Sequence, residues 1–371
     1  MKALRIGRSA ALLSVAALAL TACGGDDAAS SSSAPAGGSS SAAAGAEAPT
    51  ASGQLTGSGA SSQEAAMGAW TEGVKTTSPE LQVQYSPDGS GAGREAFLQG
   101  ASSFAGSDAA LKDEEKEQAK ELCGEQGAFH VPAYISPIAV AFNLEGVDKV
   151  NMDAETLAKV FSKEITTWND PAIAAQNEGV ELPATPITVV HRSDDSGTTE
   201  NFTAYLTEAA GEAWKFGEVE TWPSEITAES AQGTRGVVGQ AAQTDGAITY
   251  ADASAVGDLG TVAVKVGENY VEYSPEAAAE TVAQSEENED GSIKLDRAVD
   301  SGDVYPVVLV SYHIYCTQYG DQEVADQIKA FASYVVSEDG QKAAQEAAGS
   351  APISEKVAAK AEERISAITA G

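Results

Sequence analysis

The amino-acid sequence predicts an α/β fold in which helices cover both faces of a mostly parallel sheet. Strand-like and helix-like patterns alternate from Gln54 onward, and two apolar stretches are longer than an ordinary strand of about five or six residues. The chain has 371 residues, of which 43% are hydrophobic, so it can bury substantial cores. At about 100–200 residues per domain, this length allows two domains.

The first 22 residues have the pattern of an export signal. Three cations, an apolar run and a small-residue site follow one another: Lys2, Arg5 and Arg8, then Ala10 to Leu20, then Leu20-Thr21-Ala22 before Cys23. A run of about 11 apolar residues is too short to span roughly 30 Å of hydrocarbon, which argues against a transmembrane helix. We therefore expect residues 1–22 to be a signal peptide. Its removal would take the formal charge from −33 to −36.

The next segment, residues 24–53, is predicted to be a flexible tether. It consists of Gly, Ser, Ala, Pro and Thr apart from Asp26, Asp27 and Glu47, so it has no apolar face to bury. A chain of this composition reaches about 30 Å r.m.s. over about 30 residues. The folded body therefore begins near Gln54.

Charge and composition argue against several classes of function. A formal charge of −33 disfavours duplex nucleic acid or anionic lipid as a partner of the folded body. The chain has three His and three Cys, with no CxxC pair and no HExxH motif. A closed zinc site or a zinc protease therefore has no ligand set, and any metal would have to be held by oxygens. We expect no metal centre and no cofactor.

The elements of the body follow from local patterns. The predicted strands are Gln54 to Ser58, Leu81 to Ser86, Phe104 to Ser107, Ala133 to Asn143, Ile187 to Val190, Ala247 to Tyr250 and Tyr305 to Cys316. The predicted helices are Ser62 to Val74, Gly93 to Leu98, the solvated Lys112 to Leu122, Asp153 to Ser162 behind an Asp cap, Thr198 to Glu208, Gly236 to Gln243, Gln322 to Val336 and Asp339 to Ala347.

The two long apolar stretches predict how the body is divided. If Ala133 to Asn143 and Val307 to Cys316 each run out of one sheet into another, the chain forms two lobes. Lobe 1 would contain residues 54–138 and 312–371, and lobe 2 residues 139–311. Ligands of open α/β sheets bind outside the carboxyl ends of the strands, so we expect a ligand cleft between the lobes.

Three short stretches share one pattern, in which a strand ends, a small-residue turn follows and a helix begins. They are Thr56-Gly57-Ser58-Gly59-Ala60-Ser61-Ser62, Asp88-Gly89-Ser90-Gly91-Ala92-Gly93 and His191-Arg192-Ser193-Asp194-Asp195-Ser196-Gly197-Thr198-Thr199. A helix start exposes backbone N–H groups and the positive end of the helix dipole, which suit a small anion. Each turn alone is better explained as an ordinary N-cap, but three in one chain favour an anion site.

Charged side chains near these turns indicate which anion is bound. Arg192 offers a planar fork for two oxygens of a tetrahedral anion, and Asp194 is placed to hold its guanidinium; the alternative role of Arg192 is a surface salt bridge. Asp108 ends a predicted strand and, when ionised, only accepts hydrogen bonds. It would therefore favour an anion that keeps a proton, such as HPO4 or H2PO4, over sulfate.

The body resembles a known family in a set of motifs that extends from Gln54 to about Val357. These are Thr56-Gly57-Ser58-Gly59-Ala60-Ser61, Gly89-Ser90-Gly91-Ala92-Gly93, Ser107-Asp108, Arg192-Ser193-Asp194-Asp195-Ser196-Gly197-Thr198-Thr199, Trp168-Asn169-Asp170-Pro171, Gly246-Ala247-Ile248-Thr249-Tyr250 and Gly340-Gln341 followed by Ala351-Pro352-Ile353. They resemble the phosphate-binding lipoproteins of the Pst-type ATP-driven phosphate importer, in the periplasmic-binding-protein superfamily. The resemblance implies a type II two-lobed fold with two crossover strands.

The same resemblance implies a role for each site residue. Ser61 and Ser62 would donate to phosphate from the first turn, although the family often has an aromatic residue where this chain has Ser62. The second turn would donate through Ser90, and Asp108 would accept the phosphate proton. In the third stretch, Asp194 would orient Arg192. The phosphate-binding residues implied there are Arg192, Ser196, Gly197 and Thr198.

The expected function is an extracytoplasmic phosphate receptor, not an enzyme. It would act as a monomer, deliver inorganic phosphate to the permease subunits of an ABC importer, and sit on the outer face of the cytoplasmic membrane. Cys23 follows a lipobox-like Leu-Thr-Ala and would carry the lipid anchor. The alternatives are a secreted phosphate-ester hydrolase, and a surface phosphate sensor or adhesin that uses the same cleft.

Two cysteines remain once Cys23 is lipidated. In an oxidising compartment Cys123 and Cys316 are candidates for a disulfide bond. The alternative is a pair of buried free thiols.

Overall fold

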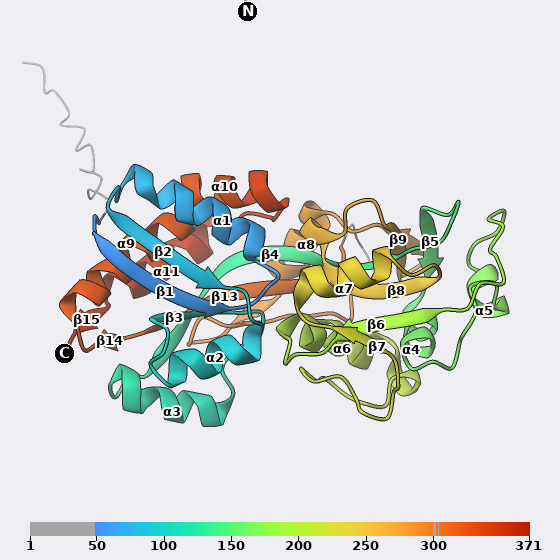
Figure 1. Ribbon diagram of the computed structural model, residues 1–371, viewed down its shortest axis with the longest axis horizontal. Coiled ribbons are helices and arrows are strands. Elements are labelled where there is room, and N and C mark those ends of the chain that lie inside the picture. Colours follow the sequence, from blue (N-terminus) through green and yellow to red (C-terminus); the bar gives the residue numbers. More distant parts are fainter. Residues whose placement is uncertain (1–48, 300–301, 303) are drawn as a thin grey trace, which may run out of the picture. The chain divides into compact units, whose positions relative to one another are not determined.

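The structure is a computed structural model that describes residues 49–299, 302 and 304–371. Strands and helices alternate along this part of the chain (Figure 1). Residues 47–371 form a compact unit of their own. The predicted signal peptide, Cys23 and the tether up to residue 48 lie outside the described residues.

Most strands belong to one sheet of 11 strands. They are β1 (Gly53–Gly59), β2 (Leu81–Ser86), β3 (Phe104–Ser107), β4 (Ala128–Phe142), β5 (Lys149–Met152), β6 (Thr188–Arg192), β7 (Glu229–Ala231), β8 (Ala247–Asp252), β9 (Gly260–Val266), β10 (Asn269–Val271) and β13 (Val308–Cys316). Two small pairs are β11 (Glu286–Glu287) with β12 (Ile293–Lys294), and β14 (Gln318–Tyr319) with β15 (Thr369–Ala370).

Helices lie between most of these strands. The α-helices are α1 (Glu64–Gly73), α2 (Ser90–Leu98), α3 (Asp113–Cys123), α4 (Ala154–Phe161), α5 (Pro171–Ala174), α6 (Gly197–Ala209), α7 (Gly233–Ala242), α8 (Pro275–Ala283), α9 (Gln322–Val336), α10 (Glu338–Ala348) and α11 (Glu355–Ser366). Short 3-10 turns are η1 (Val74–Thr76), η2 (Gly211–Ala213) and η3 (Ala253–Ala255). In the part of the chain that is described, no helix has the length and apolar character needed to cross a membrane.

The strand order brings both parallel and antiparallel pairs into the sheet. The order is β2-β1-β3-β13-β4-β8-β6-β7, and β9 joins it at β4 while also pairing with β5 and β10. The predicted parallel pairing holds for β1 with β2 and β3, and for β6 with β7 and β8. In contrast, β4 and β13 run antiparallel to each other and to their outer neighbours β8 and β3. In Figure 1, α1 and α10 lie on one side of β1 and β2, with α2 and α3 on the other.

The long strand β4 changes partner along its length. Its first part, Ala128–Pro137, pairs with β13, and its second part, Ile138–Phe142, pairs with β8. Nearly every residue of β4 is buried, because its apolar run is covered on both faces. It begins at Ala128, five residues before the predicted start at Ala133. The predicted lobe boundaries, 54–138 with 312–371 and 139–311, stay a prediction.

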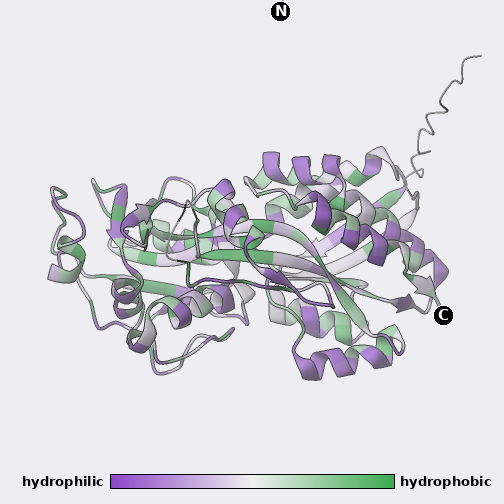
Figure 2. Cartoon of the chain, turned by 180° about the vertical axis from the view of Figure 1, so that it is seen from behind, coloured by the Kyte–Doolittle hydropathy of each residue, from purple (hydrophilic) through white to green (hydrophobic). Residues whose placement is uncertain are grey.

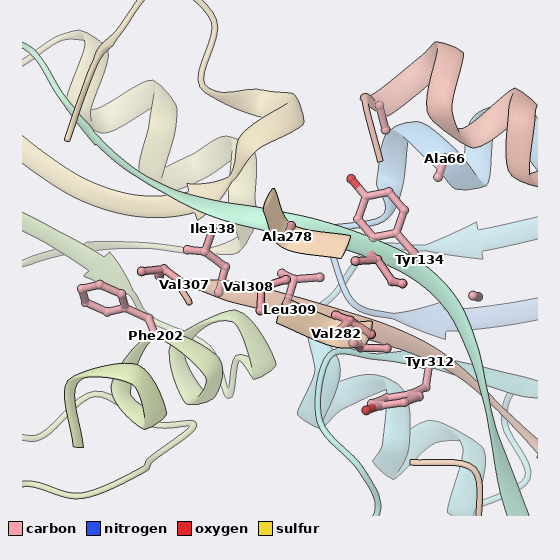
Figure 3. Close-up of a cluster of buried hydrophobic side chains, with 14 of the residues drawn as sticks. Ala66, Tyr134, Ile138, Phe202, Ala278, Val282, Val307, Val308, Leu309 and Tyr312 are labelled. Carbon is pink, nitrogen blue, oxygen red and sulfur yellow. The ribbon is translucent and has the colours of Figure 1, made fainter. Parts of the chain in front are cut away.

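The hydrophobic core follows the two long strands. Figure 3 shows Ile138 of β4 beside Val307, Val308 and Leu309, with Phe202 of α6 nearby. All five side chains are fully buried. Figure 2 shows hydrophobic residues along the central strands and hydrophilic residues on the outer helices. The core therefore fixes the strands whose ends carry the predicted site.

Candidate functional site

The three predicted turns come together at the carboxyl ends of β1, β2 and β6. Because β1 and β2 are parallel, their ends lie at the same edge of the sheet. The backbone N–H of Gly89, in the second turn, donates to the carbonyl of Gly59 in the first (N···O 2.8 Å). The N–H of Gly91 donates to the carbonyl of Asp195 in the third turn (3.1 Å). The N-terminal ends of α2 and α6 therefore lie in the same small region.

Asp108 lies where these turns meet, directly after β3, and its side chain is 4% exposed. Its Oδ1 accepts a hydrogen bond from the Ser62 hydroxyl (2.6 Å), and its Oδ2 accepts one from the Thr198 hydroxyl (2.9 Å). Burial raises the pKa of this carboxyl, and the hydroxyl donors together with the charge of Arg192 offset part of that shift. Both carboxylate oxygens therefore act as acceptors toward donors from two different turns. The resemblance implied no side-chain partner of this kind for Ser62.

Ser90 and Gly197 complete the close contact around Asp108. The Ser90 hydroxyl oxygen accepts from the backbone N–H of Asp108 (3.1 Å). A Cβ added at Gly197 would lie 2.8 Å from both the Ser90 Oγ and the Asp108 Cβ. Since real Cβ atoms do not approach so closely, only glycine lets the start of α6 reach this point.

Arg192 enters the same region from the end of β6. Its Nε donates to Oδ1 of Asp194 (2.8 Å), and its Nη2 is paired with Oδ2, so the carboxylate holds the guanidinium in a forked contact. Its Nη1 lies 3.5 Å from the Thr198 hydroxyl. Burial opposes ionisation of Asp194, but its contacts with Arg192 prevail and lower its pKa. The arrangement buries a cation beside the Thr198 hydroxyl that donates to Asp108.

Ser196 is the N-cap of α6. Its hydroxyl oxygen accepts from the backbone N–H of Thr199 (3.1 Å), which is the capping interaction that the sequence left as an alternative. Its own N–H donates to the carbonyl of Glu220 (3.1 Å). Because the capping oxygen acts as an acceptor, the hydroxyl proton is left to donate elsewhere.

Ser61 contacts a fourth segment that the sequence analysis did not identify. The Ser61 hydroxyl oxygen accepts from the backbone N–H of Thr234 (3.0 Å) and lies 3.0 Å from the Thr234 hydroxyl. Thr234 stands at the start of α7, after Gly233, whose φ of +70° is the left-handed conformation that glycine favours. The backbone N–H of Gly233 donates to Asp194 (3.1 Å). The Gly-Thr pair was the available signal, but the helix was predicted to begin only at Gly236.

The two remaining cysteines form a disulfide bond. Cys123 at the end of α3 is bonded to Cys316 at the end of β13, with a Cα–Cα distance of 4.7 Å. The structure therefore confirms the disulfide and excludes the pair of free thiols. Among the residues described, no three His, Cys, Asp or Glu side chains are grouped so that they hold a metal ion.

Comparison with known sequences places the chain in a family. A family model described as a PBP superfamily domain matches residues 44–339. The phosphate-binding protein PstS2 of Mycobacterium bovis BCG is 36% identical over 381 residues and covers 100% of both chains. The phosphate-binding protein PstS 3 of Mycobacterium leprae is 34% identical over 287 residues, covering 75% of this chain and 77% of the relative.

Solved structures share the fold at lower sequence identity. The high-affinity periplasmic phosphate-binding protein PfluDING, solved with bound phosphate, has a TM-score of 0.69 and 23% identity, covering 84% of this chain and 93% of its own. A phosphate-binding protein of Stenotrophomonas maltophilia has a TM-score of 0.66 and 21% identity, covering 84% and 94%. These neighbours confirm the mixed α/β fold class of the periplasmic binding proteins. The chain belongs to the PBP superfamily and, within it, to the family of the PstS phosphate-binding proteins.

Proposed function

We propose that this chain is an extracytoplasmic receptor that captures inorganic phosphate between its two lobes and delivers it to an ABC-type import permease. Two relatives that are 36% and 34% identical, and that cover 100% and 75% of this chain, are named phosphate-binding proteins. One solved neighbour is a putative phosphate ABC transporter substrate-binding protein with bound phosphate from Clostridium perfringens. These names support the substrate and the transport role together.

The buried carboxylate of Asp108 among hydroxyl donors is the observation that carries the proposal. A protonated phosphate needs both donors for its bare oxygens and an acceptor for its proton, and Asp108 supplies the acceptor between Ser62 and Thr198. Arg192 supplies the cation at this point, and Asp194 fixes its orientation. The start of α6 at Gly197 adds backbone N–H groups and a helix dipole.

In the proposed complex each site residue has one role. Ser62 and Thr198 donate through their backbone N–H groups, because their hydroxyl protons go to Asp108. The other donors are Ser61 and Ser90 from the first two turns, and Arg192, Ser196 and Gly197 from the third. Asp108 accepts the proton of HPO4 or H2PO4. Sulfate has no proton at neutral pH, so one of its oxygens would face the carboxylate without a hydrogen bond between them.

Hydrogen bonding of the histidines supports binding rather than ester hydrolysis. A serine nucleophile needs a base within hydrogen-bond reach. The side chain of His191 stacks on Trp222, with ring centroids 4.9 Å apart, and its Nδ1 contacts the carbonyl of Arg192. His130 and His313 bond to groups outside the site. We therefore propose that the chain is not an enzyme.

We further propose that the chain is exported and anchored by lipid on Cys23. The tether after Cys23 would let the folded unit move between solution and the permease. Replacing Cys23 by alanine should remove incorporation of radiolabelled palmitate. Palmitate incorporated equally by both chains would contradict the anchor.

Calorimetric titration tests the receptor proposal. Residues 24–371, which contain the whole compact unit, are unfolded, dialysed to remove bound ligand, refolded and titrated with phosphate and then sulfate. The expected result is one phosphate per monomer and no heat from sulfate. Absence of phosphate binding would contradict the proposal. A measurement of phosphate uptake by cells that lack the chain would separate transport from a sensor or adhesive role.

A further inference from the structure

An ion-pair cluster joins the two sides of the site without lining it. Arg94 of α2 is 1% exposed, and its guanidinium contacts two carboxylates. Its Nε donates to Glu115 of α3 (3.1 Å), which belongs to the same predicted lobe. Its Nη1 and Nη2 each lie 2.8 Å from an oxygen of Glu220, 126 residues further along the chain in the segment after α6. The forked contact with Glu220 therefore crosses between the predicted lobes.

Both partners of this contact are bonded to site elements. The Nη1 of Arg94 also donates to the hydroxyl of Ser107 (3.1 Å), the residue before Asp108. On the other side, the carbonyl of Glu220 accepts from the N–H of Ser196, the cap of α6. One ion pair thus connects the Asp108 side of the site to the α6 side.

Two cations stabilise the ionised carboxylate of Glu220. Lys112, which precedes α3, places its Nζ 2.5 Å from the carboxylate. Burial would raise the pKa of Glu220, but Arg94 and Lys112 outweigh it, so the pKa is lowered. Glu200 and Glu218 line a pocket of about 450 Å³ together with Glu220. Burial, and then the negative charges of Glu220 and Glu218, raise the pKa of Glu200 to about 8. Separating Arg94 from Glu220 would leave the buried Glu220 carboxylate without its buried cation.

We propose that Arg94, Lys112 and Glu220 form a latch that holds the two lobes closed over the ligand. The identity of the ligand in this inference rests on the proposed function, whereas the effect of the latch on the separation of the lobes does not. The three residues are positioning residues, because their contacts reach Ser107 and the site residue Ser196 rather than the ligand. Contacts that form only on closure slow ligand release, whereas capture is made by the open form.

The test compares two isosteric substitutions on the same arginine. E220Q weakens the contact between lobes, while E115Q weakens the contact within lobe 1, and each leaves Arg94 one intact carboxylate partner. Stopped-flow measurement should show phosphate dissociating about tenfold faster from E220Q, the loss expected for a charge-assisted hydrogen bond, with the association rate unchanged. E115Q should dissociate at the wild-type rate.

Thermal melting separates a latch from a general stabilising role. Both substitutions remove a carboxylate partner of Arg94 and should lower the melting temperature, but only E220Q should also speed phosphate release. If E220Q and E115Q release phosphate equally fast, the latch is overturned.

A distance measurement tests the latch without relying on phosphate. Spin labels on E121C, in α3, and K215C, after η2, report the separation of the lobes at two exposed positions. The labels are attached without reductant, so the disulfide stays intact. With or without phosphate, E220Q should lengthen the mean distance and E115Q should not. An unchanged distance in E220Q contradicts the latch, whereas a wild type that gives no phosphate heat contradicts the proposed function alone.

Discussion

Asp108 determines anion selectivity in this account, because it is the buried acceptor among donors. D108N keeps the shape of the side chain but replaces one acceptor oxygen by a donor NH2 group. We expect phosphate affinity to fall by about ten- to hundredfold, from the loss of a charge-assisted hydrogen bond worth about 1.5–3 kcal/mol. Discrimination against sulfate should weaken as well.

Competition calorimetry measures both effects of D108N. The matched control is D252N, the same change at a buried carboxylate of β8 that bonds to Tyr134. D252N should leave selectivity unchanged. If D108N rejects sulfate as strongly as the wild type does, the role of Asp108 as proton acceptor is wrong.

Gly197 gives a second prediction at the residue scale. In G197A the new Cβ would lie within 3 Å of Ser90 and Asp108, so the start of α6 must move away from the site. Phosphate affinity should fall at least about tenfold, since misplacing a positioned group by about 1 Å is costly. G239A in α7, where a Cβ meets no atom within 4 Å, should bind as the wild type does. Equal affinities in isothermal titration would contradict the prediction.

Residue identity alone predicted which turns carry small donors, but not which side chains meet. Ser61 and Ser90 were recognisable because small hydroxyl residues between a strand and a helix leave backbone N–H groups open to an anion. The contact of Ser61 with Thr234 joins residues 173 positions apart, and the contact of Arg94 with Glu220 joins residues 126 apart. No local pattern contains such a pairing, so both required the tertiary structure.

At the scale of elements, the disulfide joins the end of α3 to the end of β13. The bridge closes a loop of 193 residues, which restricts the unfolded chain strongly. We expect the double substitution C123A/C316A to lower the free energy of unfolding by about 2–5 kcal/mol, as measured by urea denaturation. Phosphate affinity should change less than twofold, because the bridge lies away from Asp108. A large loss of affinity with unchanged stability would contradict this.

His130 of β4 makes the stability of the segment before α3 depend on pH. Its Nε2 accepts from the backbone N–H of Leu111 (2.9 Å), so it must stay unprotonated at that nitrogen. Burial lowers its pKa from 6.5 to about 4. As the pH falls, the unfolded chain binds this proton before the folded chain does. The contribution of neutral His130 to the free energy of unfolding is therefore fully present above pH 6.5 and is lost as the pH falls toward 4.

The substitution H130Q measures this contribution, since Gln keeps an acceptor but does not titrate. Urea denaturation at pH 7 and pH 4.5 should show a fall in unfolding free energy that is about 2–3 kcal/mol smaller in H130Q than in the wild type. An equal fall in both proteins would show that His130 is not the titrating group.

The sequence predicted long or strongly patterned elements better than short or polar ones. β2, β3 and α9 have the predicted bounds, because apolar alternation or a helical stripe marks them. α11 was not predicted, since only Ala361 and Ile365 of its 12 residues are buried and its apolar face is narrow. Two-residue strands such as β11 depend on tertiary pairing and carry no periodic signal.

At the scale of the whole molecule, a strongly acidic chain is proposed to bind an anion. This is consistent because the Debye length is about 8 Å at physiological ionic strength, while hydrogen-bond donors act at contact. The distant carboxylates should still repel an approaching phosphate. We therefore expect the association rate to rise as NaCl is increased from low to physiological concentration, while the dissociation rate changes little. A stopped-flow association rate that falls with salt would contradict this.

Equilibrium dialysis of radiolabelled phosphate against ligand-stripped residues 24–371, with and without a large excess of sulfate, shows whether the chain binds phosphate and selects it over sulfate. We expect one tightly bound phosphate per chain in both conditions, because Asp108 disfavours an anion that has no proton to donate. Loss of the bound label in sulfate would contradict selection by Asp108. No bound label at all would mean that the turns around Asp108 are helix caps and that the chain is not a phosphate receptor.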